Sequence, residues 1–294
     1  MKGIIMAGGS GTRLYPVTLA VSKQLLPIYD KPMVYYPMSI LMLAGINDIL
    51  LITTPNEQSR FKEIFGDGSN LGIKISYAKQ PKPEGLAQAF ILGKDFIGDD
   101  SVCFILGDNI FYGGGLRKRL VDAKEFAEKG IASIFGYFVN DPERFGIAEF
   151  DSNFKVLSVE EKPSNPKSNY AITGLYFFDN KAVKYSSKLK PSSRGELEII
   201  GVIDQYLKSK RLRIDLLGRG FTWLDTGTHD SLSEASEFVK MIEQRQGIQI
   251  GCLEEISYIN GWLSKEKLIE RASVMGNSPY GKHLINVANG KIIY

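Results

Sequence analysis

A glycine-rich segment near the N-terminus combines the residue types that bind phosphate groups. A predicted short buried strand over residues 2–7 leads directly into Gly8-Gly9-Ser10-Gly11-Thr12-Arg13, and Lys23 follows. Glycine lets backbone N–H groups approach a phosphate because it has no Cβ and tolerates positive φ. Arg13 and Lys23 add positive charge, so we predict an anion site here; a structural glycine turn is the alternative.

Two better-known phosphate loops do not match this segment. The dinucleotide-binding fingerprint would need a third glycine where Leu14 stands, and the P-loop would need a Gly-Lys-Ser/Thr ending. The missing glycine argues against an NAD-dependent oxidoreductase, and a dinucleotide-binding assay would test that class directly.

Two aspartates far apart in the sequence could act on one ion. Asp108 follows the apolar run 102–106, and Asp225 lies in Trp223-Leu224-Asp225-Thr226-Gly227. Each has a structural alternative, because aspartate is common in turns and at helix starts. Two carboxylates from separate strands can also hold one Mg²⁺ that takes phosphate oxygens as its other ligands.

Three further polar features can be explained by structural roles alone. Residues 80–88 form a proline-stiffened loop ahead of a predicted helix, and 160–163 carry the mixed charges of a solvated strand end. His229 and His283 are too few and too separate to indicate a Ser-His-Asp or Cys-His arrangement. Hydrolytic chemistry of that type is therefore not predicted.

The glycine-rich segment, together with Leu14, Pro16 and Lys23, resembles the nucleotide-binding signature of the sugar-nucleotide pyrophosphorylases, also called nucleotidyltransferases. Later segments narrow this resemblance to the members that join dTTP and glucose 1-phosphate, and it covers nearly the whole chain. The resemblance implies an enzyme that releases pyrophosphate and makes dTDP-glucose, the first step towards dTDP-rhamnose and related deoxysugars. It also implies Mg²⁺ as the cofactor.

The resemblance assigns roles to individual residues. It implies that Asp108 and Asp225 hold the metal and that Gln80 and Gly85 contact the pyrimidine. Arg13, Lys23 and Lys162 complete the implied catalytic set. The implied sugar-phosphate site consists of Gly146, Glu161, Lys162, Ile172, Thr173, Tyr176 and Arg194. Phe145 stands where relatives often have tyrosine, so a contact that needs that hydroxyl is not expected.

Two alternative functions remain. A glutamine amide such as that of Gln80 can serve thymine or uracil in one orientation and cytosine in the other. A UTP- or CTP-dependent enzyme is therefore the closest alternative. A non-catalytic nucleotide sensor is a second one, although a sensor has little need for both carboxylates and both cations.

Composition limits the possible partners. The chain has 294 residues, of which 44% are hydrophobic and 23% charged, and its formal net charge is only +3. Such a balance gives no reason to expect nucleic-acid binding, and apolar runs too short to cross a bilayer give none to expect membrane insertion. Cys103 and Cys252 lack metal-ligand spacing, and with no export signal expected we predict a cytoplasmic protein.

Strand and helix patterns alternate along the first half, which predicts an α/β, Rossmann-like, mostly parallel twisted sheet with helices on both faces. Ligands bind such sheets at the carboxyl ends of the strands. The predicted strands are 2–7, 49–52, 73–78, 102–106, 131–139, 146–150, 156–160, 172–178 and 211–217. The predicted helices are 32–44, 57–65, 86–96, 116–129, 180–187, 196–208, 229–246 and 265–271.

We predict a core over residues 1–228 and a C-terminal helical segment over 229–294. Within the core, 1–139 would bind the nucleotide and 140–228 would form a sugar-binding β insertion. The family resemblance further implies a homotetramer and feedback inhibition by a deoxythymidine-sugar at a subunit interface. The residues it implies for regulation are Gly115, Glu255 and Ile256.

Overall fold

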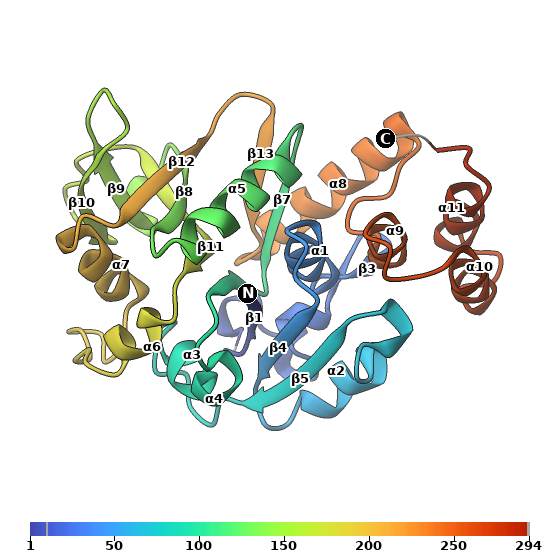
Figure 1. The fold of residues 1–294 in the computed structure, drawn as a ribbon, viewed down its shortest axis with the longest axis horizontal. Coiled ribbons are helices and arrows are strands. Elements are labelled where there is room, and N and C mark those ends of the chain that lie inside the picture. Colours follow the sequence, from blue (N-terminus) through green and yellow to red (C-terminus); the bar gives the residue numbers. More distant parts are fainter. Residues whose placement is uncertain (10, 293–294) are drawn as a thin grey trace.

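A nine-stranded sheet runs through the centre of the computed structural model, which describes residues 1–9 and 11–292 (Figure 1). Its main path has the order β10-β9-β11-β6-β1-β4-β5, and β8 joins β11 to β12. The strands are β1 (Lys2–Ala7), β4 (Asp48–Thr53), β5 (Lys74–Lys79), β6 (Val102–Leu106), β8 (Ala132–Phe138), β9 (Gly146–Phe150), β10 (Val156–Glu161), β11 (Tyr170–Phe178) and β12 (Leu212–Leu217).

Strand direction divides this sheet into two halves. In the half that contains β1, neighbours are parallel, and Ile5 lies opposite Leu51 on one side and Ile105 on the other. The strand β11 then runs antiparallel to β6, and the predicted hairpin of β9 and β10 follows it. The α/β class with a parallel Rossmann-like centre is therefore confirmed, and the predicted β insertion extends the same sheet.

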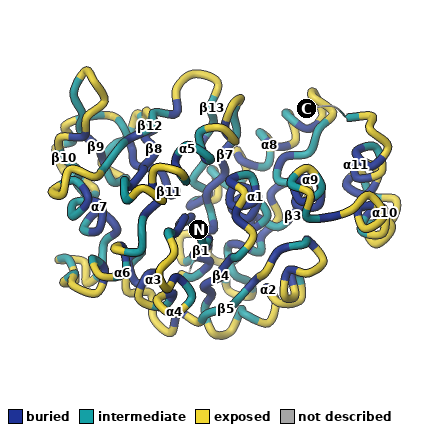
Figure 2. Tube along the Cα trace, viewed as in Figure 1, coloured by how far each residue is buried: buried dark blue, intermediate teal, exposed yellow. Residues whose placement is uncertain are grey.

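Helices cover both faces of the sheet because alternate residues of each buried strand point to opposite sides. Ile5 belongs to a core cluster that includes residues of α1, α2 and α5, whereas Ile4 belongs to a second cluster with residues of α3, α4, α6 and α7. The buried strands and exposed loop tips are visible in Figure 2. These helices are α1 (Tyr35–Leu43), α2 (Gln58–Phe65), α3 (Gln88–Leu92), α4 (Lys94–Ile97), α5 (Leu116–Glu128), α6 (Lys181–Ser186) and α7 (Ile199–Lys208).

Two small ribbons and several short turns complete the core. The ribbons pair β2 (Pro27–Ile28) with β3 (Lys31–Pro32), and β7 (Asn109–Gly113) with β13 (Phe221–Asp225). The 3-10 turns are η1 (Thr12–Leu14), η2 (Val17–Leu19), η3 (Lys23–Leu25), η4 (Ser69–Leu71) and η5 (Pro142–Arg144).

The end of the chain is helical, as predicted. It contains α8 (His229–Gln246), α9 (Leu253–Ile259), α10 (Lys265–Val274) and α11 (Pro279–Ala288). A capping box formed by Thr228 and Ser231 starts α8, α9 packs on α1, and α10 pairs with α11. Among the described residues, the structure contains no helix long and apolar enough to cross a membrane.

The predicted helix over 86–96 is wrong as a single element. The structure breaks it at Gly93 into α3 and α4. A Cβ at this position would lie 2.9 Å from Ile4 Cδ1, so the chain passes too close to the sheet for a larger residue. The sequence pattern also failed to predict β7, β13, α9 and α11.

Candidate active site

A cavity of about 690 Å³ opens where β1 and β6 end, at the rim predicted for ligands. It brings together most of the residues predicted for the site. Those that line it are Gly8, Gly9, Gly11, Thr12, Arg13, Lys23, Gln80, Gly85, Asp108, Gly146, Glu161, Lys162, Ile172, Tyr176, Arg194 and Asp225. Ser10 lies outside the described residues.

Thr173 is the predicted sugar-site residue whose side chain the cavity does not reach. It is fully buried in β11, and its Oγ1 has no hydrogen-bond partner among the described residues. Its neighbours Ile172 and Gly174 do line the cavity. The threonine hydroxyl is therefore not available to a ligand in the cavity.

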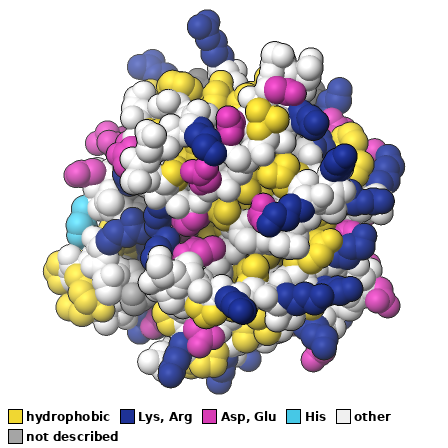
Figure 3. Space-filling view, turned by 90° about the vertical axis from the view of Figure 1, so that its left-hand side faces the viewer, with side chains coloured by type: hydrophobic (Ala, Val, Ile, Leu, Met, Phe, Trp, Pro, Cys, Tyr) yellow, Lys and Arg dark blue, Asp and Glu magenta, His cyan; other side chains and the backbone are white. Residues whose placement is uncertain are grey.

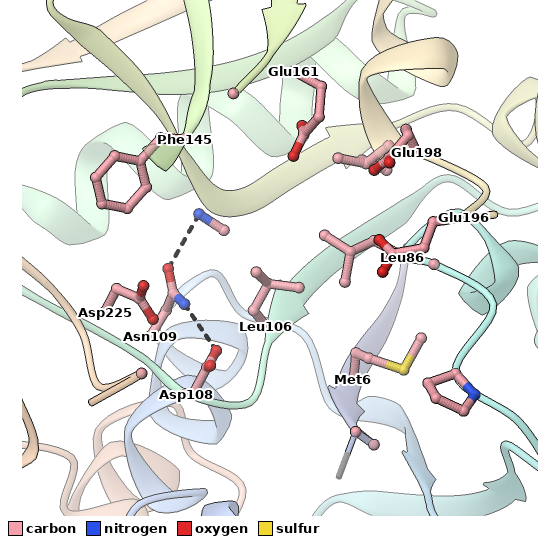
Figure 4. Close-up of a pocket in the computed structure, with 18 of the residues that line it drawn as sticks. Met6, Leu86, Leu106, Asp108, Asn109, Phe145, Glu161, Glu196, Glu198 and Asp225 are labelled. Atoms are coloured by element: carbon pink, nitrogen blue, oxygen red, sulfur yellow. Dashed lines mark hydrogen bonds between the residues drawn. The ribbon is translucent and has the colours of Figure 1, made fainter. Parts of the chain in front are cut away.

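The unpredicted ribbon of β7 and β13 brings the two aspartates together. Asp225 ends β13 directly opposite Asn109, the residue after Asp108. Thr226 continues the connection, because its Oγ1 donates to the backbone oxygen of Asp108 over 2.8 Å. Both carboxylates consequently face the same end of the cavity (Figure 4).

Lys23 forms an ion pair with Asp108, and both side chains are largely buried. Burial alone would raise the pKa of the Asp108 carboxyl, but Lys23 and the amide of Asn109 hold it below its ordinary value. Asp108 is therefore charged at neutral pH, and this end of the cavity contains a fixed pair of opposite charges.

The pKa of Asp225 is shifted upward, opposite to that of Asp108. Burial and the nearby charge of Asp108 raise the pKa of Asp225 to about 6, although Lys23 and Arg13 oppose the rise. A carboxylate next to a second carboxylate in a buried place is poorly solvated and repelled. A cation between the two aspartates would remove both penalties, so this pair fits a divalent metal ion.

Asn109 connects the parts of the site, and sequence reasoning missed it. Its Nδ2 donates to Asp108 Oδ1 over 3.0 Å, and its Oδ1 accepts from Gly174 N over 3.1 Å and from Trp223 Nε1 over 2.6 Å. Figure 4 shows two of these bonds. Its position beside Asp108 was the signal that could have found it.

The described residues of the glycine-rich segment, 8–9 and 11–13, line the edge of the cavity. Gly9 and Gly11 have φ values of 98° and 58°, a region that favours glycine. Thr18 holds the turn by donating to Gly11 O over 2.8 Å, and Gln24 donates to Gly8 O over 3.3 Å. Arg13 lines the cavity next to this turn, which supports the predicted anion site.

The opposite end of the cavity is rich in carboxylates. Arg194 lies between Glu161, Glu196 and Glu198, at 3.4, 3.2 and 3.5 Å. Burial and the charge of Glu198 raise the pKa of the Glu161 carboxyl. Hydroxyl-rich ligands suit such a place because carboxylates accept hydrogen bonds from hydroxyl groups. Sequence reasoning missed Glu196 and Glu198, which lie close to Arg194 in the chain.

Lys162 adopts an unusual backbone conformation at this end. Its φ is 43°, and its N–H donates to Phe145 O over 3.0 Å. Left-handed backbone in a residue with a side chain is held only where the surroundings require it, often at functional sites. Phe145 itself packs edge-on against Trp223 at 5.3 Å, so a ring at this position has a packing role without a hydroxyl.

The residues predicted for regulation lie away from the cavity. Gly115 caps α5 with φ of 75°, whereas Glu255 and Ile256 are buried in α9. Arg117 of α5 donates to Asn260 after α9 over 2.8 Å, so these two elements are neighbours.

The outer surface near β10 and α7 has mixed charge, with lysine and arginine side chains among acidic ones (Figure 3).

Comparison with known proteins identifies the family. The model of the nucleotidyl transferase family matches residues 2–241. A glucose-1-phosphate thymidylyltransferase from Neisseria meningitidis is 58% identical to this chain, and the match covers 98% of this chain and 99% of the relative. One from Xanthomonas campestris is 56% identical, and the match covers 98% of this chain and 97% of the relative. One from Mycobacterium tuberculosis is 52% identical, covering 98% of this chain and 99% of its own.

Solved structures agree with this assignment. A protein from Bacillus anthracis, described as a glucose-1-phosphate thymidylyltransferase and crystallised with sucrose, is 42% identical to this chain and superposes with a TM-score of 0.74. The match covers 81% of this chain and 94% of that protein. A UDP-glucose pyrophosphorylase in complex with UDP-glucose shares the fold, with 23% identity and a TM-score of 0.71. The match covers 82% of this chain and 98% of that protein. The chain is therefore an enzyme of the nucleotidyl transferase family and belongs to its glucose-1-phosphate thymidylyltransferase group.

Proposed function

We propose that the enzyme converts dTTP and glucose 1-phosphate into dTDP-glucose and pyrophosphate, the first step towards dTDP-rhamnose and related deoxysugars. The observation that carries the proposal is the division of one cavity into two ends. One end combines the glycine-rich turn with Arg13, Lys23 and the two aspartates, and the other combines Glu161, Lys162 and Arg194. The first suits a triphosphate and the second a sugar phosphate.

The reaction needs no general base, because the attacking group is already a phosphate anion. One of its oxygens attacks the α-phosphorus, and the bond to the departing pyrophosphate breaks in line with that attack. Arg13 and the amides of the turn would hold the pyrophosphate, and Lys162 would orient the sugar phosphate. The enzyme works by holding two polyanions together and neutralising the charge that develops between them.

Mg²⁺ is the cofactor we propose, with Asp108 and Asp225 as its protein ligands. The fit rests on the donors, since two carboxylates with opposed pKa shifts face one end of the cavity. When bound, the ion would neutralise negative charge on the phosphate oxygens. Lys23, which pairs with Asp108, would place a further positive charge beside the reacting phosphates.

Assembly, regulation and location extend the proposal. A homotetramer would have a mass of about 131 kDa, four times 32.7 kDa, measurable by light scattering. Feedback inhibition by dTDP-rhamnose would be non-competitive, and substitution of Glu255 would relieve it. The adjacency of α5 and α9 supports a shared regulatory region there. The two free, buried cysteines support a cytoplasmic location.

Product identification tests the proposal. With Mg²⁺, dTTP and glucose 1-phosphate, ³¹P NMR should show the two signals of a sugar diphosphate and the signal of pyrophosphate appearing together. Added chelator should stop both. Release of inorganic phosphate instead, or nucleotide binding without turnover under all conditions, would contradict the proposal and favour a sensor.

A further inference from the structure

A series of hydrogen bonds through Gln88 and Glu84 holds the amide of Gln80 at the wall of the cavity. Gln80 is 5% exposed and lines the cavity. Its Nε2 donates to Gln88 Oε1 over 2.7 Å, and Gln88 Nε2 donates to Glu84 Oε2 over 2.7 Å. Gln88 begins α3 and is itself 8% exposed, so its bond with Gln80 is buried, whereas Glu84 lies at the surface.

The chemistry of its partners fixes the orientation of Gln88. An ionised carboxylate can only accept hydrogen bonds, so the side of Gln88 that faces Glu84 must be its NH₂ group. On the other side, the backbone N–H of Glu84 donates to Gln88 Oε1 over 3.3 Å, and an N–H can only donate. Both contacts select the same orientation of the Gln88 amide.

The orientation of Gln80 follows from that of Gln88. Because Gln88 presents an oxygen, Gln80 must turn its NH₂ group towards it, and Oε1 is left on the opposite side. This Oε1 lies against Gly8: a Cβ on residue 8 would be only 2.2 Å from it. A larger residue at position 8 would have to displace this oxygen, which faces the glycine-rich turn at the cavity wall.

The two classes of pyrimidine differ in what they offer such a wall. Thymine and uracil present an N3–H donor beside a carbonyl acceptor, whereas cytosine presents an N3 acceptor beside an amino donor. A freely rotating glutamine amide serves either class by flipping. An amide whose NH₂ group is tied to Gln88 keeps its oxygen as an acceptor, and a flip would set two oxygens against each other.

We propose that Gln88, oriented by Glu84, is a positioning residue for base specificity: it keeps Gln80 Oε1 available to the N3–H of thymine or uracil and thereby rejects cytosine. The inference rests on the proposed function and narrows its substrate class. The backbone of this loop is held separately, because Leu197 N donates to Glu84 O over 2.7 Å and Ala87 N donates to Leu197 O over 3.0 Å. Changing the Gln88 side chain should therefore leave the loop in place.

The test compares kcat/KM for dTTP, dUTP and dCTP, which share one sugar and differ in the base. Wild-type enzyme should use dTTP and dUTP and discriminate against dCTP. Gln88→Met keeps the length of the side chain but removes its amide, so the ratio of dTTP to dCTP activity should fall by about tenfold or more. Gln205→Met, in α7, is the matched control and should leave the ratio unchanged.

Each outcome bears on the inference separately from the function. If Gln88→Met lowers activity with all three nucleotides equally, Gln88 has only a structural role and the inference is wrong. Wild-type enzyme that uses dCTP as well as dTTP would also overturn it, whereas failure with dTTP would overturn the proposed function itself. Gln88→Leu, which also lacks the amide, provides the same comparison if Gln88→Met does not fold.

Discussion

At the residue scale, the site depends on two aspartates whose surroundings make them chemically different. Lys23 and Asn109 hold the pKa of Asp108 below its ordinary value, while burial and Asp108 raise the pKa of Asp225. A single cation beside both would favour the charged form of each. The pair therefore has an electrostatic reason to bind a metal ion that neither residue has alone.

Replacing Asp225 by asparagine should leave the fold intact and lower kcat by about 10²-fold or more, because it removes one positioned charge from the reaction centre. Steady-state pyrophosphate release measures the change, and circular dichroism verifies folding. Asp99→Asn, which removes an exposed carboxylate outside the cavity, should have wild-type activity. Near-normal turnover of folded Asp225→Asn would remove this residue from the mechanism.

Metal affinity should depend on pH through Asp225. A metal ion binds the ionised carboxylate, so affinity should fall as the pH drops through about 6, where the proton competes. Titration with Mn²⁺, followed by electron paramagnetic resonance, should show a loss of up to about tenfold per pH unit below that value. Asp225→Asn should bind more weakly with a flatter pH profile; equal affinity at about pH 7.5 and 5 in the wild type would contradict this account.

Residue types predicted much of the site but not the residues that orient it. The glycine-rich turn, Arg13 and Asp108 stood out because their chemistry or position after a buried strand is unusual. Asn109 and Gln88 did not, because a buried amide has no sequence signature: its importance lies in which partners three-dimensional folding places beside it. Glu198 was missed because a carboxylate near an arginine is ordinary on protein surfaces.

At the element scale, short strands and loops do the positioning. The ribbon of β7 and β13 holds Asp225 opposite Asn109, yet neither strand had a pattern that distinguished it from a loop. Long, continuously apolar strands such as β4 and β6 were predictable because parallel strands are buried on both faces. Ribbons of five residues depend on pairing with a distant partner, and that pairing is invisible in local sequence.

The loop before α3 offers a test at this scale. Gly85 has φ of 102°, and a Cβ there would lie 2.5 Å from the backbone of Leu197. Gly85→Ala should therefore move this loop away from the segment that carries Glu196 and Glu198, raising KM for dTTP by about tenfold. Steady-state kinetics would show the change.

The matched control for that variant is Gly98→Ala. Gly98 also has positive φ, at 54°, but nothing lies within 4 Å of an added Cβ. Both variants should lose about 1–3 kcal/mol of stability from backbone strain alone, measured by urea unfolding. If Gly85→Ala binds dTTP as well as Gly98→Ala does, contact with Leu197 is not needed for nucleotide binding.

At the scale of the whole molecule, one sheet supports both ends of the cavity. Its parallel half ends at the glycine-rich turn and Asp108, and its antiparallel half contributes Glu161 and Gly174. The strand β11 joins these halves by pairing with β6, so the distance between the two ends of the cavity is set by a continuous hydrogen-bonded sheet. The alternation of helices and strands predicted the first half, whereas the way β11 joins the halves required the structure.

The most direct measurement of the central claim is pyrophosphate release with and without glucose 1-phosphate across dTTP, UTP, CTP, ATP and GTP, each repeated with chelator. We predict fast release with dTTP that requires both glucose 1-phosphate and the metal ion. Release that continues without glucose 1-phosphate, or that dTTP does not support, would contradict direct transfer of the thymidylyl group to the sugar phosphate.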